Sequence, residues 1–351
     1  MRVLAIVQSA DHVCCRYRVA AFAGAMAERG IRLELSPIQT GLAARLRQIR
    51  ATGGFDVVLL QRRLLPAWQL VLLRRCARRL VFDFDDAVFQ RDSFSRKPAA
   101  SAMRLLRFWA AVYSADAVLA GNAHLAGRAA AYVGTDRVHV LPTCLEPQRY
   151  RPACHVRRGS AARLVWIGQE STLPSLDCAR RHLAAAAARL GGLELRAISD
   201  RYPELRGVRC IRRPWSEATE AAELAECDVG VSWLPDDDWS RGKCGLKVLQ
   251  YMAAGLPVVA NPVGMNLELV TDGRTGFLAS TPREWADAIA RLAEDPELRH
   301  AMGVAGRRLV EEHFNASRMA PQFARLIAAV AGQSRVACRA AAASAECRVA
   351  L

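Results

Sequence analysis

The sequence predicts an α/β fold of two doubly wound halves, each a parallel sheet with helices packed on it. Short apolar runs that indicate buried strands alternate with amphipathic stretches from Val3 onward, and the same alternation restarts at Leu164. Between the halves lies a proline-punctuated passage, residues 143–162, without an apolar period. The length of 351 residues suits two domains of roughly 150 residues each.

The first half opens as a strand, a loop, a helix and a second strand, which is typical of Rossmann-like domains. It lacks the G-x-G-x-x-G pattern of dinucleotide-binding proteins, which argues against a dehydrogenase. Asn122 is expected to cap the helix that follows it. Strands are expected over residues 3–7, 31–35, 55–61, 80–86, 117–120 and 138–142, and helices over residues 16–30, 64–79, 100–113 and 123–132.

In the second half, a long alanine-rich helix is expected after Thr172. Strands are expected over residues 164–167, 193–198, 208–211, 228–234 and 258–260, and further helices over residues 215–226, 246–253, 266–270, 282–294, 297–314 and 316–330. We therefore expect two α/β domains, residues 1–155 and 160–315, then a helix over 316–332 and a disordered tail over 333–351.

The composition is that of an ordinary globular protein, with 52% hydrophobic and 24% charged residues. No apolar run approaches the roughly 20 residues that cross a bilayer, and the run Val3–Val7 is shorter than the apolar core of about 7–15 residues in a secretory signal. We therefore expect a cytoplasmic protein. The eleven cysteines include no C-x-x-C pair, so most are expected to be small buried apolar residues rather than disulfides or zinc ligands.

The formal net charge of +15 indicates an acidic partner. Nucleic acid is disfavoured, because the arginines are spread along the chain without a basic tract or an aromatic-interleaved motif. An anionic membrane surface or a phosphorylated lipid fits better, and would place the protein peripherally at the inner face of the membrane. The alternative is an excess of arginine on solvated faces.

The lysines single out one stretch of the chain. Of the 49 basic residues only three are lysine, and two of these, Lys243 and Lys247, stand four residues apart where Gly245 opens a helix. A lysine ammonium is a compact charge that suits a phosphate. Cations at a helix start oppose the helix dipole, and such local conflicts occur at functional sites, so we favour a binding role over a solvated face.

The run Lys243–Ala260, KCGLKVLQYMAAGLPVVA, resembles the nucleotide-sugar-binding segment of glycosyltransferase family 4. The resemblance covers nearly the whole chain and is strongest over residues 228–276. It implies the GT-B fold, two Rossmann-like domains facing across a cleft, with residues 316–332 as a closing helix that crosses back onto the first domain. The family usually carries two glutamates with seven residues between them. Here Gly242 and Gln250 stand at those positions, so the first carboxylate is missing.

The resemblance implies that the second domain binds a nucleotide-diphosphate sugar. Lys247, with Lys243 or Arg241, would stabilise charge on the departing diphosphate, and Gln250 would hold the ribose. The other donor-binding candidates are Gly168, Ser171 and Thr172 in one turn, and Gly264, Asn266 and Glu268 in another. Either turn offers backbone N–H groups to an anion, but the first is equally an ordinary helix cap, and Glu268 equally caps its own helix.

Four residues of the first half are candidates on the acceptor side. Arg16 and Arg18 follow the first strand at an expected helix start, where they would bind a phosphate or an acidic acceptor. Asp85 and Asp86 end the fourth strand, where they would position an acceptor hydroxyl. The alternatives for these aspartates are helix capping, pairing with arginine, and a metal site, which is disfavoured because GT-B enzymes generally work without a bound metal.

The sequence thus predicts a retaining glycosyltransferase that moves a sugar from a nucleotide-diphosphate sugar to a glycan, lipid-linked or other acceptor, without a metal or other cofactor. The resemblance implies front-face attack, in which the leaving phosphate takes the proton of the acceptor. One alternative is a GT-B nucleotide-sugar epimerase. The other is a non-catalytic nucleotide-sugar-binding protein, and the missing glutamate is the best support for it. The sequence does not identify the sugar, the base or the acceptor.

Overall fold

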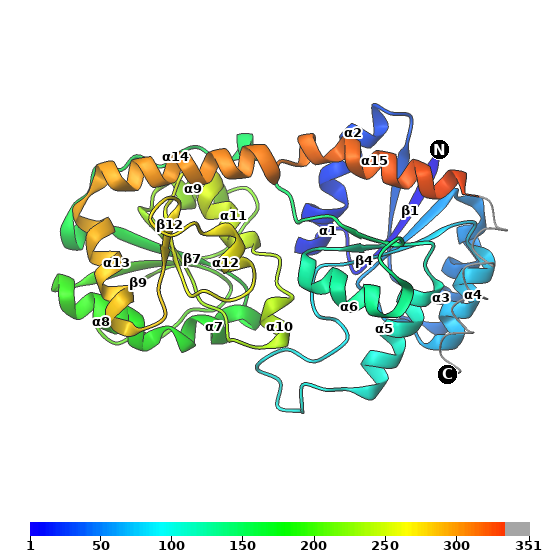
Figure 1. Ribbon diagram of the computed structural model, residues 1–351, viewed down its shortest axis with the longest axis horizontal. Coiled ribbons are helices and arrows are strands. Elements are labelled where there is room, and N and C mark those ends of the chain that lie inside the picture. The colour runs from blue at the N-terminus through cyan, green and yellow to red at the C-terminus, as the bar shows by residue number, and fades with distance from the viewer. Residues whose placement is uncertain (334–351) are drawn as a thin grey trace. The chain divides into compact units, whose positions relative to one another are not determined.

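The computed structural model describes residues 1–333, and the chain divides into two compact units (Figure 1). Unit 1 comprises residues 1–91, 98–142 and 319–333, and unit 2 comprises residues 92–97 and 143–318. The expected disordered tail lies outside the described residues, except for Gln333.

Unit 1 is built on a six-stranded parallel sheet with the order β2-β1-β3-β4-β5-β6. Its strands β3, β4 and β5 are buried along their whole length, which is why uninterrupted apolar runs predicted them. The strands are β1 (Arg2–Val7), β2 (Arg32–Pro37), β3 (Val57–Gln61), β4 (Leu80–Phe84), β5 (Ala117–Ala120) and β6 (Val138–Val140).

The helices of unit 1 are α1 (Val13–Arg18), η1 (Ala20–Phe22), α2 (Ala23–Ala27), α3 (Leu42–Ala51), η2 (Thr52–Gly54), α4 (Ala67–Cys76), α5 (Ala102–Ser114) and α6 (Ala123–Val133). The connection from β1 to β2 runs in one direction along the sheet, and the connections from β2 onward run in the other. Because parallel crossovers are right-handed, the helices of the first connection lie on one face of the sheet and those of the later connections on the other. Helices α3, α4, α5 and α6 accordingly pack side by side in that order. The aromatic rings of Phe82, Phe84 and Phe108 pack between the sheet and α5.

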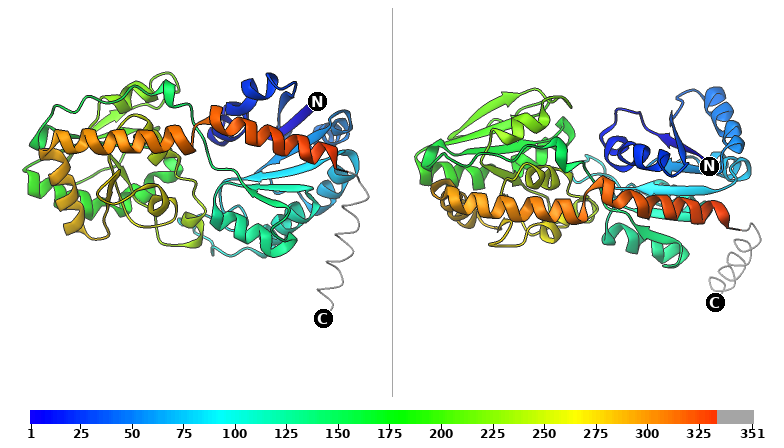
Figure 2. Two further views of the ribbon diagram at one scale, coloured as in Figure 1. Left: turned by 45° about the horizontal axis from the view of Figure 1, so that its top comes forward. Right: turned by 90° about the horizontal axis from the view of Figure 1, so that it is seen from above.

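The division between the two units falls inside α15 (Ala316–Gly332), between Arg318 and Met319. The later part of this helix packs on the η1 side of unit 1, where the rings of Phe323 and Phe22 lie 4.9 Å apart. In Figures 1 and 2 (left), the strands of unit 1 lie between α15 on one side and α5 and α6 on the other.

Unit 2 contains a second six-stranded parallel sheet with the order β12-β11-β10-β7-β8-β9. Helices α8 and α13 pack together, and α11 packs against α14. The strands are β7 (Arg163–Ile167), β8 (Leu193–Ile198), β9 (Val208–Arg213), β10 (Val229–Ser232), β11 (Val258–Ala260) and β12 (Gly276–Leu278). The helices are η3 (Pro147–Arg149), η4 (Gly159–Ala161), η5 (Glu170–Thr172), α7 (Leu173–Cys178), α8 (Arg180–Leu190), α9 (Glu220–Ala225), α10 (Asp238–Arg241), α11 (Leu246–Ala253), α12 (Met265–Leu269), α13 (Pro282–Glu294) and α14 (Pro296–His313).

The core of unit 2 joins the sheet to α8 and α13, with Trp166, Leu183 and Trp285 fully buried in it. The nine described cysteines are free thiols, and five of them are buried, as expected for small apolar residues. Within residues 1–333, no helix combines the length and the apolar character that a membrane span requires.

The prediction of α/β folding in both halves is confirmed, but α3 and β12 were not predicted, and α4 is three residues shorter at each end than the helix expected over residues 64–79. Three further helices differ from their predicted extents. The helix expected over residues 16–30 begins at Val13 and is broken into α1, η1 and α2. The alanine-rich helix is interrupted at Ala179, where α7 ends and α8 begins. The helix expected over residues 215–226 is confined to α9.

Candidate functional site

Ligands of open α/β sheets bind outside the carboxyl ends of the strands, where neighbouring connections leave in opposite directions. In unit 2 the connection from β7 runs toward β8 and the connection from β10 leads to β11, so this point lies between β7 and β10. In unit 1 it lies between β1 and β3. The candidate residues follow these strands and their neighbours, and so form one group in each unit.

Two glycines let three short helical segments of unit 2 meet. Gly245 caps α11 with a left-handed φ of 68°, and a Cβ there would lie 2.5 Å from Leu269 Cδ1 and 3.2 Å from Met265 Cβ. Gly264 has a φ of 53°, and a Cβ on it would lie 3.1 Å from the Cα of Arg241. The start of α11, the start of α12 and the end of α10 therefore lie together.

Lys243 and Lys247 flank the start of α11 and lie over two indole rings. The Nζ atom of Lys247 is 4.8 Å from the ring centroid of Trp166, and that of Lys243 is 4.8 Å from the ring centroid of Trp239. Burial, followed by the charge of Lys243, lowers the pKa of Lys247 to about 7. Among the described residues, no carboxylate forms an ion pair with Lys247. An anionic ligand beside this side chain would favour its protonated form, so the site suits an anion that brings the compensating charge.

Two of the aspartates just before α11 are engaged by other residues of unit 2, and one of them, Asp237, accepts a hydrogen bond of 3.1 Å at Oδ1 from Ser93 Oγ. Asp237 caps α10, because its Oδ1 accepts a hydrogen bond of 2.8 Å from the backbone N–H of Ser240. Asp236 forms an ion pair of 2.7 Å with Arg241. These contacts speak against either carboxylate replacing the missing family glutamate.

Gln250 belongs to a buried chain of hydrogen bonds. Its Nε2 donates to the hydroxyl of Tyr150 at 3.3 Å, and this hydroxyl donates to Glu220 Oε1, also at 3.3 Å. The other carboxylate oxygen of Glu220 accepts a bond of 2.8 Å from Trp215 Nε1. Gln250 itself is only 4% exposed. The amide nitrogen of Gln250 is therefore already engaged in a hydrogen bond within the protein interior.

The turn of Gly168, Ser171 and Thr172 follows β7. Gly168 donates its N–H to Ile198 O at 3.1 Å, and a Cβ on it would lie 2.5 Å from the ring of Trp166, the same indole that Lys247 covers. Thr172 forms a reciprocal capping box with Gln169 at the start of η5, and it is also the N-cap residue of α7, without a side-chain hydrogen bond to that helix. Ser171 is exposed. The turn thus lies next to Lys247, but two of its polar groups are engaged internally.

The second donor turn, Gly264 to Glu268, mixes internal and exposed groups. The side chain of Asn266 is buried, accepts a bond from Ser232 Oγ at 3.1 Å and donates to Asn261 Oδ1 at 3.3 Å. Its backbone N–H donates to Val263 O at 3.2 Å. Glu268 is exposed in the first turn of α12. Asn266 therefore holds the ends of β10 and β11 together, whereas Glu268 is accessible.

In unit 1, the predicted helix-start position of Arg16 and Arg18 is wrong. Both lie in the last turn of α1, where cations favour the dipole, because the helix begins three residues earlier than expected. Arg18 is buried and forms a bidentate pair with Asp83, with Nη2 to Oδ1 at 2.5 Å, and it also donates to Leu141 O at 2.8 Å. These contacts make Arg18 a core ion pair, while Arg16 contacts Tyr17.

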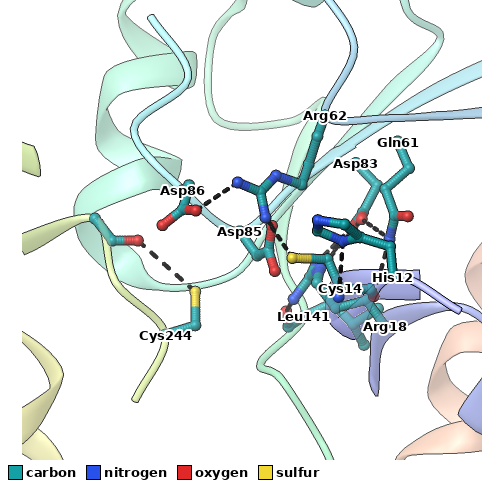
Figure 3. A network of polar contacts seen from close by, with 11 residues as sticks. His12, Cys14, Arg18, Gln61, Arg62, Asp83, Asp85, Asp86, Leu141 and Cys244 are labelled. Atoms are coloured by element: carbon teal, nitrogen blue, oxygen red, sulfur yellow. Dashed lines mark hydrogen bonds and ion pairs between the residues drawn. The ribbon is translucent and has the colours of Figure 1, made fainter. Parts of the chain in front are cut away.

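Asp85 and Asp86 meet an arginine that the sequence analysis missed. Arg62 follows β3, and its guanidinium lies 3.2 Å from Asp85 Oδ1 and 2.5 Å from Asp86 Oδ2 (Figure 3). Its φ of 55° is the one positive value at a non-glycine residue among the described residues. Such backbone strain persists where surrounding contacts enforce it, often at functional sites. Of the predicted alternatives for the aspartates, pairing with arginine is the one that the structure shows, and the arginine is Arg62.

Two more residues of this group were also missed. His12 caps α1 by accepting a bond of 3.2 Å from the Cys14 backbone N–H to Nδ1, and Cys14 Sγ contacts Arg62. Burial and the charge of Arg62 lower the pKa of His12, which favours the neutral imidazole. Their position directly after β1 was the available signal. Within residues 1–333, no group of three or more His, Cys, Asp or Glu side chains is arranged to hold a metal ion.

Comparison with known proteins gives a family match for unit 2. Residues 155–295 match the family model described as Glycosyl transferases group 1. The D-inositol 3-phosphate glycosyltransferase of Streptomyces scabiei is 28% identical over 246 residues, 61% of this chain and 53% of the relative. The alpha-1,3/1,6-mannosyltransferase ALG2 of Homo sapiens is 28% identical over 167 residues, 44% of this chain and 38% of the relative. The chain thus spans about half, or less, of the length of these relatives.

Solved structures resemble the chain over most of its length. Sucrose-phosphate synthase from Thermosynechococcus elongatus superposes with a TM-score of 0.72 at 18% identity, covering 93% of this chain and 98% of that one. HepE from Anabaena, solved with UDP and glucose, gives 0.67 at 15% identity, covering 93% of this chain and 99% of that one. At such identities the likeness shows the fold, and the predicted fold class is confirmed.

Proposed function

We propose that the protein transfers a sugar from a nucleotide-diphosphate sugar to a hydroxyl of a glycan or lipid-linked acceptor, because residues 155–295 match the family model described as Glycosyl transferases group 1. The observation that carries the proposal is the pair Lys243 and Lys247 at the start of α11, beside the point between β7 and β10 where ligands of such sheets bind. Unit 2 would hold the donor in this reading.

In the proposed reaction, the bond between the anomeric carbon and the diphosphate oxygen breaks while the acceptor oxygen bonds to the same carbon. The acceptor approaches on the face from which the diphosphate leaves, so the sugar keeps its configuration, and the acceptor proton passes to the leaving phosphate oxygen. Negative charge grows on the diphosphate as the bond breaks. Lys247, which no carboxylate of residues 1–333 neutralises, interacts more strongly with that growing charge than with the intact donor, and so accelerates the step.

The group in unit 1 supports a role on the acceptor side. Asp85 and Asp86 follow β4, and Arg62 holds both carboxylates in place. A carboxylate in that position orients an acceptor hydroxyl by accepting its hydrogen bond. Arg16 remains our candidate for an acidic group on the acceptor. Arg18 does not fit that role, because Asp83 and Leu141 already engage its guanidinium.

The test incubates the full chain with activated sugars, with and without acceptors. Thermal shift against UDP-, GDP- and other nucleotide sugars selects the donor, because a ligand that binds the folded state raises its melting temperature. The names of the relatives supply the first acceptor, an inositol phosphate, and UDP-glucose is the first donor to try. Release of nucleoside diphosphate that depends on the acceptor supports transfer. Interconversion of the free sugar nucleotide would instead indicate an epimerase, and binding without turnover would indicate a non-catalytic binding protein.

A further inference from the structure

The outer side of three neighbouring helices in unit 1 carries large apolar side chains that no part of the described chain covers. Helices α3, α4 and α5 lie side by side on unit 1 (Figure 1). Trp68 is 53% exposed, Leu106 54% and Trp109 41%, and Leu42, Val71 and Met103 are exposed as well. Seven of the fifteen large apolar side chains exposed among the described residues lie on these three helices, so the surface is concentrated rather than scattered.

The same helices carry positive charge and no acidic residue. Their sequences contain seven arginines and neither Asp nor Glu. Among the described residues, no carboxylate forms an ion pair with Arg47, Arg50, Arg75 or Arg107. One of the seven, Arg74, forms an ion pair of 3.1 Å with Asp116. The acidic residues of the intervening strands and loops pair with arginines outside these helices: Asp56 with Arg78, Asp83 with Arg18, and Asp85 and Asp86 with Arg62.

On α4 the two kinds of residue form one stripe. Trp68, Val71 and Arg75 recur at three- and four-residue spacing, which places them along one side of the helix, and all three are exposed. Tryptophan prefers the boundary between water and hydrocarbon, and arginine keeps its head in the polar layer while its stem lies along apolar surface. Tryptophan and leucine interleaved with arginine are typical of helices that lie in a membrane interface.

We propose that the outer face of α3, α4 and α5 binds the surface of an anionic lipid bilayer. The bilayer is favoured over nucleic acid because Val71, Met103 and Leu106 offer nothing to a phosphate backbone. It is favoured over an acidic protein because the surface spans three helices that pack about 10 Å apart, an expanse of roughly 20 Å that suits a continuous sheet of lipid. The proposal goes beyond the transferase activity and does not depend on it.

The test is flotation of the full chain with vesicles of phosphatidylcholine alone, or with about a third phosphatidylglycerol. We expect binding to the anionic vesicles that weakens at high salt, and little binding to phosphatidylcholine. The variant R47Q/R50Q/R75Q should lower the partition coefficient by roughly 100-fold, since each arginine near an anionic surface contributes about fivefold. The control R189Q/R201Q/R283Q removes the same charge from unit 2 and should bind like the unaltered chain.

The apolar part of the face is tested separately with W68S/L106S/W109S, against V140S/V304S as a control with exposed apolar residues elsewhere. The first variant should lose vesicle binding, and brominated lipids should quench less of the tryptophan fluorescence in mixtures with it. Circular dichroism and melting temperature verify that each variant is folded. The proposal is overturned if the unaltered chain fails to float with anionic vesicles, or if both altered triples float as well as their controls. It is also overturned if the apolar variant keeps full binding while heparin or single-stranded DNA competes, because a polyanion site would then explain the charge.

Discussion

Lys247 is the residue on which the proposed chemistry depends most. Its ammonium lies over Trp166, and Lys243 is four residues away. If it stabilises the leaving diphosphate, Lys247→Ala should lower turnover by at least about 100-fold, as the loss of one charge-stabilising donor commonly does. Steady-state rates with the donor selected by thermal shift measure the effect. Lys97→Ala, which removes an exposed lysine, is the matched control, and full activity of Lys247→Ala would contradict the assignment.

The burial of Lys247 also has a consequence for stability. Its pKa is lowered from 10.5 to about 7, so between these values the unfolded chain holds a proton that the folded chain lacks. The free energy of unfolding should therefore rise with pH across this window. Below pH 7 the folded protein bears the full cost of burying the charged lysine. Lys247→Met should be more stable than the unaltered chain by about 1–3 kcal/mol at pH 6, and the difference should shrink toward pH 10. Urea unfolding at several pH values measures this, and a difference that does not vary with pH would refute the predicted shift.

Gln250 stands where the family that this chain resembles usually carries glutamate, and its contacts suggest a reason for the difference. The amide donates to Tyr150, whose hydroxyl donates in turn to Glu220. An ionised glutamate at position 250 has no proton to donate, and it would place a second buried carboxylate beside Tyr150. Gln250→Glu should therefore destabilise the fold by about 1–3 kcal/mol at pH 8, and less near pH 5, where the carboxyl is protonated.

The control for this change is Gln250→Met, which removes the donor without adding charge and should cost the same at both pH values. Urea unfolding at pH 5 and pH 8 compares the two variants. If Gln250→Glu and the unaltered chain are equally stable at pH 8, the hydrogen bond that Gln250 donates to Tyr150 is not the reason why glutamine stands at this position.

Single residues also show where prediction from the sequence stops. The two lysines were found because lysine is rare in this chain and their spacing is regular. Arg62 was not found, because its role arises only when β3 and β4 pair side by side and its own backbone adopts a positive φ. Arg18 was assigned to the acceptor because neither its burial nor its pairing with Asp83, 65 residues away, is visible in the local pattern.

At the scale of elements, buried parallel strands were the most predictable part. The strands Ala117–Ala120 and Val258–Ala260 have their predicted ends, because a strand covered on both faces is a continuous apolar run. Leu193–Ile198 also has its predicted ends, although Glu194 and Arg196 interrupt its apolar residues. The first helix was misplaced because its cap is His12, a residue outside the usual N-cap set. Its break at Val19 depends on packing that no local period reveals.

The contact of α14 with the end of α11 gives a prediction at this scale. A Cβ on Gly303 would lie 2.0 Å from Gly255 O, so α14 can approach the loop after α11 only with glycine there. Gly303→Ala should lower the stability of unit 2 by about 1–3 kcal/mol, as overpacking does. Gly127→Ala in α6 meets nothing within 4 Å and should instead stabilise its helix by about 0.5–1 kcal/mol. Thermal unfolding of both variants is the measurement, and a neutral Gly303→Ala would contradict the predicted packing.

At the scale of the whole molecule, both halves repeat one principle. In each sheet, two neighbouring strands have connections that leave in opposite directions, β1 and β3 in unit 1 and β7 and β10 in unit 2. Polar residues lie at the carboxyl ends of these strands. The two groups differ in charge, because the arginine of unit 1 is neutralised by Asp85 and Asp86 whereas no carboxylate in the described part of the chain pairs with Lys247. This difference supports the assignment of the diphosphate to unit 2 and of a neutral hydroxyl to unit 1.

The central claim is that the lysines at the start of α11 hold the diphosphate of the donor. A crystal structure of the protein with the nucleoside diphosphate that raises its melting temperature most tests this directly. We predict diphosphate oxygens within about 3 Å of Lys247 Nζ, with the ribose toward Gln250. A diphosphate bound in unit 2 away from α11, or bound only to unit 1, would contradict the account.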